Sequence, residues 1–193
     1  MTSNLLSDAA KAYRKLLNTE YRIVLGRKNN AIEIKIGFFA DQFYHLAGLH
    51  KLRKSYPFKK KSHGKVFEDI LNDRISNELI KYDETYQEIA LRLAAIIKLE
   101  EILDSHDTKY YKYDIKKVRI PSRLKADFLL EGNIDGSKYV FTFLTQEKAV
   151  CSCKSIFYKG TYDYALGQTK YTLLALEKTN CATGESSMIY NRL

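Results

Sequence analysis

The chain has 193 residues, of which 45% are hydrophobic, and its formal net charge is +9. This length and composition predict a single domain, residues 1–193, with a substantial core, and exclude a mostly disordered polar chain. No apolar run approaches the roughly 20 residues needed to span a bilayer, and residues 1–8 lack the cationic and apolar regions of a secretory signal. The sequence therefore predicts a cytoplasmic protein that does not bind a membrane.

The excess of positive charge favours an anionic partner, such as nucleic acid or an acidic protein, over a neutral one. A solvated basic surface without a partner is the alternative. Basic residues form two blocks along the chain. The first block has no Asp or Glu between Gln42 and Phe67 and contains Lys51, Arg53, Lys54, Lys59, Lys60, Lys61 and Lys65. The second has the single acid Asp114 and contains Lys109, Lys112, Lys116, Lys117, Arg119, Arg123 and Lys125.

The N-terminal part of the chain carries the periodicity of a helix and then of a hairpin. Apolar residues recur at helical spacing over 5–17, which predicts an amphipathic helix. Residues 21–25 and 31–36 alternate or cluster apolar side chains as strands do, and 26–30 supplies turn residues between them. We therefore expect a helix followed by an antiparallel hairpin with one buried face.

The hairpin is followed by a helical middle. Phe43, Leu46 and Leu49 form an apolar stripe in a helix predicted from about residue 41 to 52. Such a helix places His45 and His50 on different ridges, and a glycine inside it, Gly48, costs roughly 1 kcal/mol relative to alanine. Further helices are predicted as one or two short ones over 65–81 and a long one over 85–104.

The remaining chain reads as strands separated by turns. The predicted strands are 110–115, 126–131, 139–144, 150–158 and 171–178. A turn at 133–136 joins two of them. The predicted fold class is α+β: an N-terminal helix and hairpin, a helical middle inserted at about 59–105, and a C-terminal antiparallel sheet of about four strands.

Several kinds of catalytic site are not supported by any motif. The chain has no Gly-rich phosphate loop, no Gly-x-Ser-x-Gly turn and no His-Glu-x-x-His helix. Cys151 and Cys153 fall on one face of an apolar strand, which suits small core residues, and Cys181 has no partner at metal-ligand spacing. The sequence therefore predicts no cofactor and no metal, and it disfavours a metal-dependent nuclease.

The residue types that remain suit metal-free cleavage of RNA. That reaction needs a base, an acid and cations near the phosphate, and histidine titrates near neutral pH. His45 and His50 are the candidates for proton transfer, although a histidine on an amphipathic helix is also a common structural residue. His63 is expected on a loop surface, and His106 at a helix C-terminus.

A short motif gives the sequence a family resemblance. The segment 43–48, Phe-Tyr-His-Leu-Ala-Gly, follows the strand pair with the pattern Phe-x-His-Leu-x-Gly. It resembles the phage barnase–EndoU–colicin–RelE-like (BECR) nuclease domains of phages and mobile elements, in particular the fourth phage group. The order of the later strands is similar as well, ending at 170–178. Only His45 matches a motif position with a functional role, and Gly48 is its structural companion.

The resemblance implies a metal-independent, toxin-like endoribonuclease acting on RNA in a bacterial host cell. The residues predicted to be catalytic are His45, Lys51, Lys170 and Tyr171. Those predicted to bind nucleic acid are His50, Arg53, Lys54, Lys59, Lys60 and Lys61. The alternative is a non-catalytic protein that uses the same basic face to bind nucleic acid or an acidic protein, for example a phage counter-defence factor.

Overall fold

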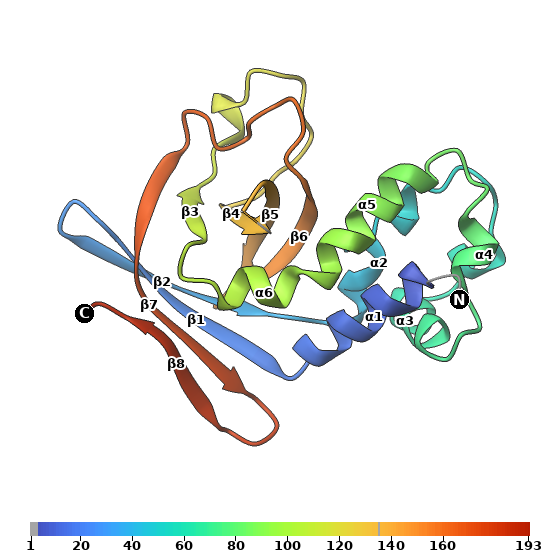
Figure 1. The fold of residues 1–193 in the computed structure, drawn as a ribbon, viewed down its shortest axis with the longest axis horizontal. Helices are drawn as coiled ribbons and strands as arrows, with labels where there is room; N and C mark the ends of the chain where they lie inside the picture. Colours follow the sequence, from blue (N-terminus) through green and yellow to red (C-terminus); the bar gives the residue numbers. More distant parts are fainter. Residues whose placement is uncertain (1–3, 135) are drawn as a thin grey trace.

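A closed β-barrel makes up one part of the molecule, and a group of helices packs against one end of it (Figure 1). The computed structural model describes residues 4–134 and 136–193; Asp135, within the predicted turn 133–136, lies outside them. The strands are β1 (Thr19–Arg27), β2 (Asn30–Gly37), β3 (Lys109–Lys112), β4 (Phe128–Ile134), β5 (Lys138–Glu147), β6 (Val150–Tyr158), β7 (Thr169–Asn180) and β8 (Ser186–Asn191). The α-helices are α1 (Leu5–Leu16), α2 (Phe43–Leu46), α3 (His63–Leu71), α4 (Asn77–Ile80), α5 (Tyr86–Ile97) and α6 (Leu99–Asp104).

The expectation of a C-terminal sheet of about four strands is wrong. The strand order is β1-β2-β6-β5-β4-β3-β7-β8, and β1 also pairs with β7, which closes seven strands into a barrel and leaves β8 as an extra strand. The N-terminal hairpin therefore belongs to the same sheet as the later strands. Closure depends on the length of β7: its first three residues pair with β3, and the rest pair with β1 on one edge and in part with β8 on the other.

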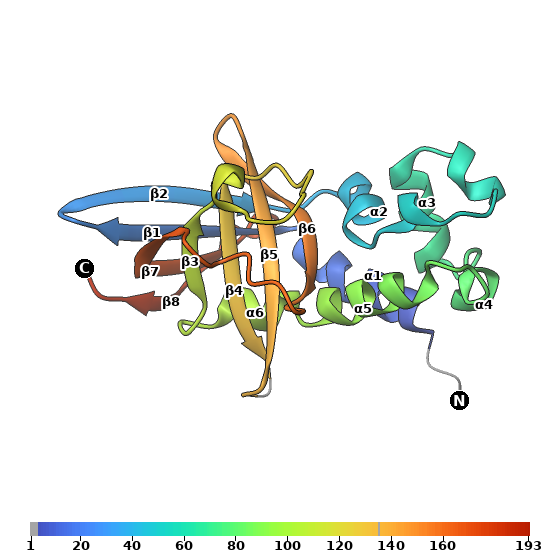
Figure 2. The same ribbon diagram turned by 90° about the horizontal axis from the view of Figure 1, so that it is seen from above.

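The predicted N-terminal helix and hairpin are confirmed. Helix α1 buries Leu6, Ala9, Tyr13 and Leu16, the face that its periodicity indicated. Residues 21–27 of β1 pair with residues 30–36 of β2, in the register Ile23 opposite Ile34. The turn consists of Lys28 and Asn29, whose φ angles of 47° and 64° are those of a two-residue hairpin turn. Figure 2 shows this hairpin extending beyond the rest of the barrel.

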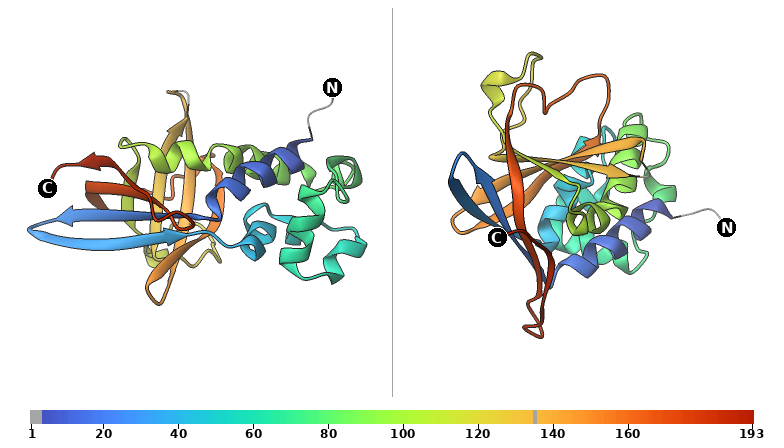
Figure 3. Two further views of the ribbon diagram at one scale, coloured as in Figure 1. Left: turned by 90° about the horizontal axis from the view of Figure 1, so that it is seen from below. Right: turned by 60° about the vertical axis from the view of Figure 1, so that its left-hand side comes forward.

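Alternation along the strands separates two apolar clusters. Side chains of one strand face fill the barrel and join the helices in the larger cluster. The opposite face of β3 to β6 carries a smaller cluster that includes Tyr111, Leu129, Phe141 and Phe143. Two long connections, 113–127 and 159–168, lie over this second cluster (Figure 3, right). The outside of the barrel is thus covered on this side by loops rather than by helices.

The helical middle contains the predicted helices with breaks. Residues 65–81 form α3 and α4, and residues 85–104 form α5 and α6, which meet at Lys98. Helix α5 packs along α1 and against β6 (Figure 3, left). The segment between Leu46 and α3 has little α-helix, so its position depends on side-chain contacts.

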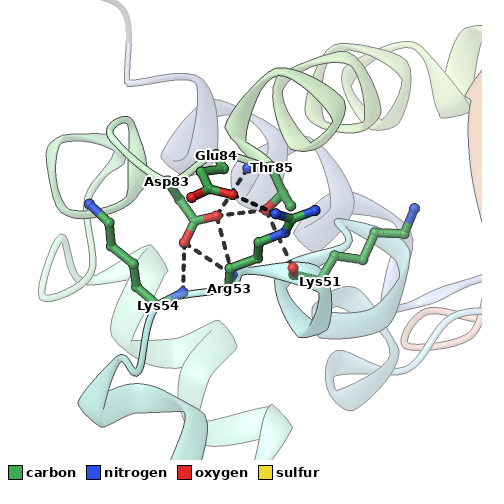
Figure 4. Close-up of polar contacts among 6 residues, drawn as sticks. All are labelled: Lys51, Arg53, Lys54, Asp83, Glu84 and Thr85. Atoms are coloured by element: carbon green, nitrogen blue, oxygen red, sulfur yellow. Dashed lines mark hydrogen bonds and ion pairs between the residues drawn. The ribbon is translucent and has the colours of Figure 1, made fainter.

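Several of these contacts are made by the carboxylate of Asp83, a residue that is 5% exposed. It accepts hydrogen bonds from the backbone N–H groups of Arg53, Lys54 and Thr85 at 3.0–3.2 Å and from the Thr85 hydroxyl at 2.8 Å (Figure 4). The Tyr56 hydroxyl also donates to this carboxylate, at 3.2 Å. Burial raises the pKa of Asp83, but the bonds from these donors outweigh burial and hold the pKa well below its usual range. Asp83 therefore fixes the chain that follows the histidine motif.

Replacing Asp83 by asparagine should lower the free energy of unfolding at pH 7 by about 2–3 kcal/mol, because buried donors lose a charged acceptor. A depressed folded-state pKa stabilises the fold above the unfolded value of 3.8, and this contribution is lost as pH falls below it. The wild type should therefore lose more stability than Asp83→Asn between neutral pH and pH 3 in urea unfolding. Asp107→Asn, at a carboxylate that is 82% exposed, is the matched control and should behave as wild type. Equal acid sensitivity of the wild type and Asp83→Asn would contradict this role.

Candidate active site

The histidine motif does not form the continuous helix predicted over 41–52. Helix α2 ends after one turn, and Gly48 takes a left-handed conformation with φ of 80° before the 3₁₀ turn η2 (Leu49–Lys51). This break changes the direction of the chain, so that the imidazole rings of His45 and His50 lie 4.9 Å apart between centroids. The prediction that the two histidines occupy separate ridges is therefore wrong, and Gly48 is the reason.

A third histidine joins them. His63, predicted to be loop surface, is the first residue of α3 and is only partly exposed. Its ring stacks on Tyr44 at 4.3 Å and lies edge-on to His45 at 4.7 Å between centroids. We call His45, His50 and His63 the histidine cluster. No sequence spacing indicates it, because His63 reaches the motif only through the packing of α3 on α2.

The histidine cluster borders a cleft of about 740 Å³, here called the histidine cleft. Its lining includes His45, His50 and Lys51, the loop Pro121–Lys125 with Tyr164, and Lys154, Ser155 and Phe157 of β6. The fixed cations that line it are Lys51, Arg92, Arg123, Lys125 and Lys154, and none of its described lining residues is a carboxylate. The charged side chains that line the cleft are therefore cationic, which favours an anionic group of a substrate.

A β-bulge aims one of these cations into the cleft. Leu144 of β5 pairs with Cys153, and the next pairing is Phe143 with Ser155, so Lys154 is the extra residue on β6. Bulges of this kind redirect side chains and recur beside active sites. Lys154 is exposed and lines the cleft together with Ser155 and Phe157.

Arg92 is held in place by contacts with β6. Its Nη1 donates hydrogen bonds to Ser155 Oγ at 3.1 Å and to the Ile156 carbonyl at 3.3 Å, and its guanidinium lies 5.5 Å from the Phe157 ring centroid. Gly48 makes room for it, since a Cβ at that position would lie 2.9 Å from Arg92 Cδ. Sequence reasoning missed Arg92. The available signal was a lone arginine among the apolar residues of α5.

The first basic block is mostly neutralised by acids that follow it in sequence. Lys51 pairs with Glu88 at 3.1 Å, Arg53 with Glu84 at 2.5 Å, and Lys61 with the buried Asp69 at 2.6 Å, while Lys59 donates to the Leu52 carbonyl at 2.7 Å. The exposed Lys54 and Lys60 have no ion pair among the described residues, and Figure 4 shows the Lys54 ammonium pointing away from Asp83. Of the block, only Lys51 lines the cleft.

The predicted late-strand residues lie elsewhere. Lys170 and Tyr171 sit at the start of β7, paired with Tyr111 and Tyr110 of β3, and neither lines the histidine cleft. The second basic block contributes instead, through Arg123 and Lys125. The structure thus brings together His45, His50 and Lys51 of the predicted site and adds residues from β6, α5 and the 121–125 loop.

A family model described as phage-Barnase-EndoU-ColicinE5/D-RelE like nuclease4 matches residues 5–193, nearly the whole chain. The chain belongs to this nuclease family. The resemblance drawn from the His-Leu-x-Gly motif is thereby confirmed, and the family supports a nuclease-like function on a nucleic-acid substrate. Neither a curated protein nor a solved structure is significantly similar to the chain.

Two further findings bear on this nuclease-family domain. Within residues 4–134 and 136–193, no three His, Cys, Asp or Glu side chains are arranged to hold a metal ion. Over the same residues, no helix has both the length and the apolar character needed to cross a bilayer.

Cys151 and Cys153 are buried on β6, and burial raises the pKa of both thiols, to about 11 and about 12. They are core residues of the barrel.

The electrostatics of the cleft favour neutral histidines. Partial desolvation lowers the pKa of His45, positive charge on His63 and Lys154 lowers it further, and Asp41 opposes them. Desolvation, with positive charge on His45, Arg92 and Lys51, lowers the pKa of His50 to about 4. Both imidazoles are therefore able to accept a proton at neutral pH.

The charges around His45 can be tested with two exposed residues of opposite sign. Lys154→Gln removes a cation that lowers the pKa of His45, so that pKa should rise. Asp41→Asn removes an anion that raises it, so the pKa should fall. Titration of the His45 imidazole by NMR measures both. Shifts of the same sign in the two variants would refute the assignment.

The left-handed conformation of Gly48 predicts an unequal pair of alanine substitutions. Gly48→Ala should lower the free energy of unfolding by about 1–2 kcal/mol, because a side chain is strained at this φ and meets Arg92. Gly64→Ala, in α3 with open space around it, should be neutral or stabilise by up to about 1 kcal/mol. Thermal or urea unfolding of both variants checks this. Equal effects would mean that the break at Gly48 is not required.

Proposed function

We propose that this nuclease-family protein is a metal-independent endoribonuclease that cleaves RNA in the histidine cleft. The observation that carries the proposal is a pair of neighbouring imidazoles, His45 and His50, that line the cleft together with fixed cations. No described residue of the lining is a carboxylate. A cleft without acids suits a phosphodiester better than a cationic substrate. The phage origin in the family description supports action on RNA inside a bacterial host, where a cytoplasmic location stays a prediction.

The proposed reaction uses the nucleophile that RNA itself carries. His45 removes the proton of the 2′-hydroxyl, the 2′-oxygen attacks phosphorus, and the bond from phosphorus to the 5′-oxygen breaks. His50 delivers a proton to that leaving oxygen, which gives a 2′,3′-cyclic phosphate and a 5′-hydroxyl end. His45 gains one proton and His50 loses one, and proton exchange with water then returns both histidines to their starting states.

The cations have a second effect besides stabilising the phosphorane. Desolvation, and then positive charge on His45, Arg92 and Lys51, keeps His50 neutral. A bound phosphodiester brings negative charge between these groups, which favours the protonated imidazole that an acid requires. Substrate binding and protonation of His50 are therefore coupled in this proposal. Lys170 and Tyr171 have no role in it, since they do not line the cleft.

Incubating the protein with end-labelled RNA in EDTA tests the proposal. Wild type should cleave, and His45→Ala and His50→Ala should each lower the rate by about 100-fold or more, the usual contribution of an acid or base. His106→Ala, at an exposed histidine outside the cleft, should retain wild-type activity. Cleavage should stop at any position that carries 2′-deoxyribose, because the nucleophile is then absent.

Two outcomes would contradict the proposal. Cleavage that requires an added divalent ion would rule out metal independence. Salt-sensitive RNA binding without cleavage by the wild type would favour the alternative, a non-catalytic binding protein that uses the same basic cleft.

A further inference from the structure

The long connection between β3 and β4 carries the second basic block away from the histidine cleft. We call its residues 115–125 the cationic loop. The C-terminal part, Pro121–Lys125, lines the cleft and belongs to the site already described. The N-terminal part contains the turn η4 (Ile115–Lys117) and continues over the outside of the barrel (Figure 2). Its three exposed cations, Lys116, Lys117 and Arg119, have no role in the proposed reaction.

The cationic loop is anchored to the barrel by its apolar residues. Ile115, Val118 and Leu124 pack against the smaller apolar cluster on β3 to β6. The backbone is held as well, because the N–H of Arg119 donates a hydrogen bond to the Tyr162 hydroxyl at 2.6 Å. The cations between these anchors are therefore carried on a positioned segment, and ordering that segment adds little to the cost of binding a ligand.

The outer cations of the loop are not neutralised by the protein. Lys116, Lys117 and Arg119 form no ion pair with any residue in the described ranges 4–134 and 136–193, and Lys117 Nζ donates to the neutral Thr169 Oγ1 at 3.3 Å. The carboxylate of Asp114 accepts the backbone N–H of Lys116 at 2.9 Å. The first basic block differs, since acids of the helical middle pair with several of its cations.

Unpaired cations that continue a phosphate-binding cleft suit a polymer with one negative charge per nucleotide better than a small anion. Between Arg119 and Arg123 the chain spans at most about 14 Å, so one strand can reach both positions. We propose that the cationic loop binds the backbone of RNA that extends out of the cleft, so that the protein acts on RNA chains rather than on short fragments. This inference rests on the proposed function, because it takes the histidine cleft as the position of the scissile phosphate.

The test measures binding of 2′-O-methyl RNA, which lacks the nucleophile, in two lengths. A dinucleotide occupies only the cleft, whereas a dodecanucleotide extends beyond it. The triple variant Lys116→Gln/Lys117→Gln/Arg119→Gln should weaken dodecanucleotide binding about tenfold or more and leave dinucleotide binding unchanged. It should also lower the slope of log affinity against log salt by about 2, because each phosphate contact on a single strand contributes about 0.7.

The matched control removes the same charge from another surface. Lys11→Gln/Arg14→Gln/Lys15→Gln changes three exposed cations of α1 that line a pocket sharing no residue with the histidine cleft, and it should retain the wild-type affinity and salt slope. Equal losses in the two triple variants would show an effect of net charge alone and would overturn the inference.

The remaining outcomes separate this inference from the proposed function. Unchanged dodecanucleotide binding by the loop variant overturns the inference even if the wild type cleaves RNA in EDTA, and it leaves an acidic protein as the partner class for the loop. If the wild type cleaves no RNA but the loop variant selectively loses dodecanucleotide affinity, the proposed catalysis fails and the RNA-binding loop stands.

Discussion

The site depends on a short parallel pairing between β2 and β6, which involves only Ile36 with Cys151 and Gly37 with Ser152. Parallel strands leave their pairing in the same direction. After this pairing, β2 continues into the histidine motif and β6 continues into Lys154, Ser155 and Phe157. The imidazoles consequently line the same cleft as these β6 residues, although more than 100 residues separate the two segments in sequence. Closure of the barrel by β1 and β7 then fixes the hairpin that supplies β2.

The helical middle is part of this site rather than an addition to it. Helix α3 supplies His63, and α5 supplies Arg92 together with Glu88, the partner of Lys51. Gly48 connects the histidine motif with α5. Its lack of a side chain allows the change of chain direction that brings His45 near His50, and it allows the close approach of Arg92. The geometry of this one turn thus decides the position of two histidines and one guanidinium.

What the sequence could predict follows from the range of the interactions. Helix α1 and the hairpin follow from local periodicity and a two-residue turn, and they are confirmed. Closure of the barrel depends on which strand edges meet, and no periodicity indicates that. Strand β8 has mostly exposed residues, and its apolar residues Met188, Ile189 and Tyr190 do not alternate with polar ones. The motif indicated His45, whereas His63 and Arg92 depend on tertiary packing. The apparent excess of charge in the first basic block was misleading for the same reason, since Asp69, Glu84 and Glu88 reach it only in the fold.

Fewer cations are therefore available to a ligand than the sequence suggests. Ion pairs and hydrogen bonds engage Arg53, Lys59 and Lys61, while the bulge at Lys154 and the 121–125 loop turn other cations toward the histidines. Desolvation and the neighbouring cations lower the pKa of His50, and the like charges that line this cleft repel one another. Under the proposed function, a bound phosphate would reduce the repulsion between these cations and would favour the protonated His50 that a leaving oxygen needs.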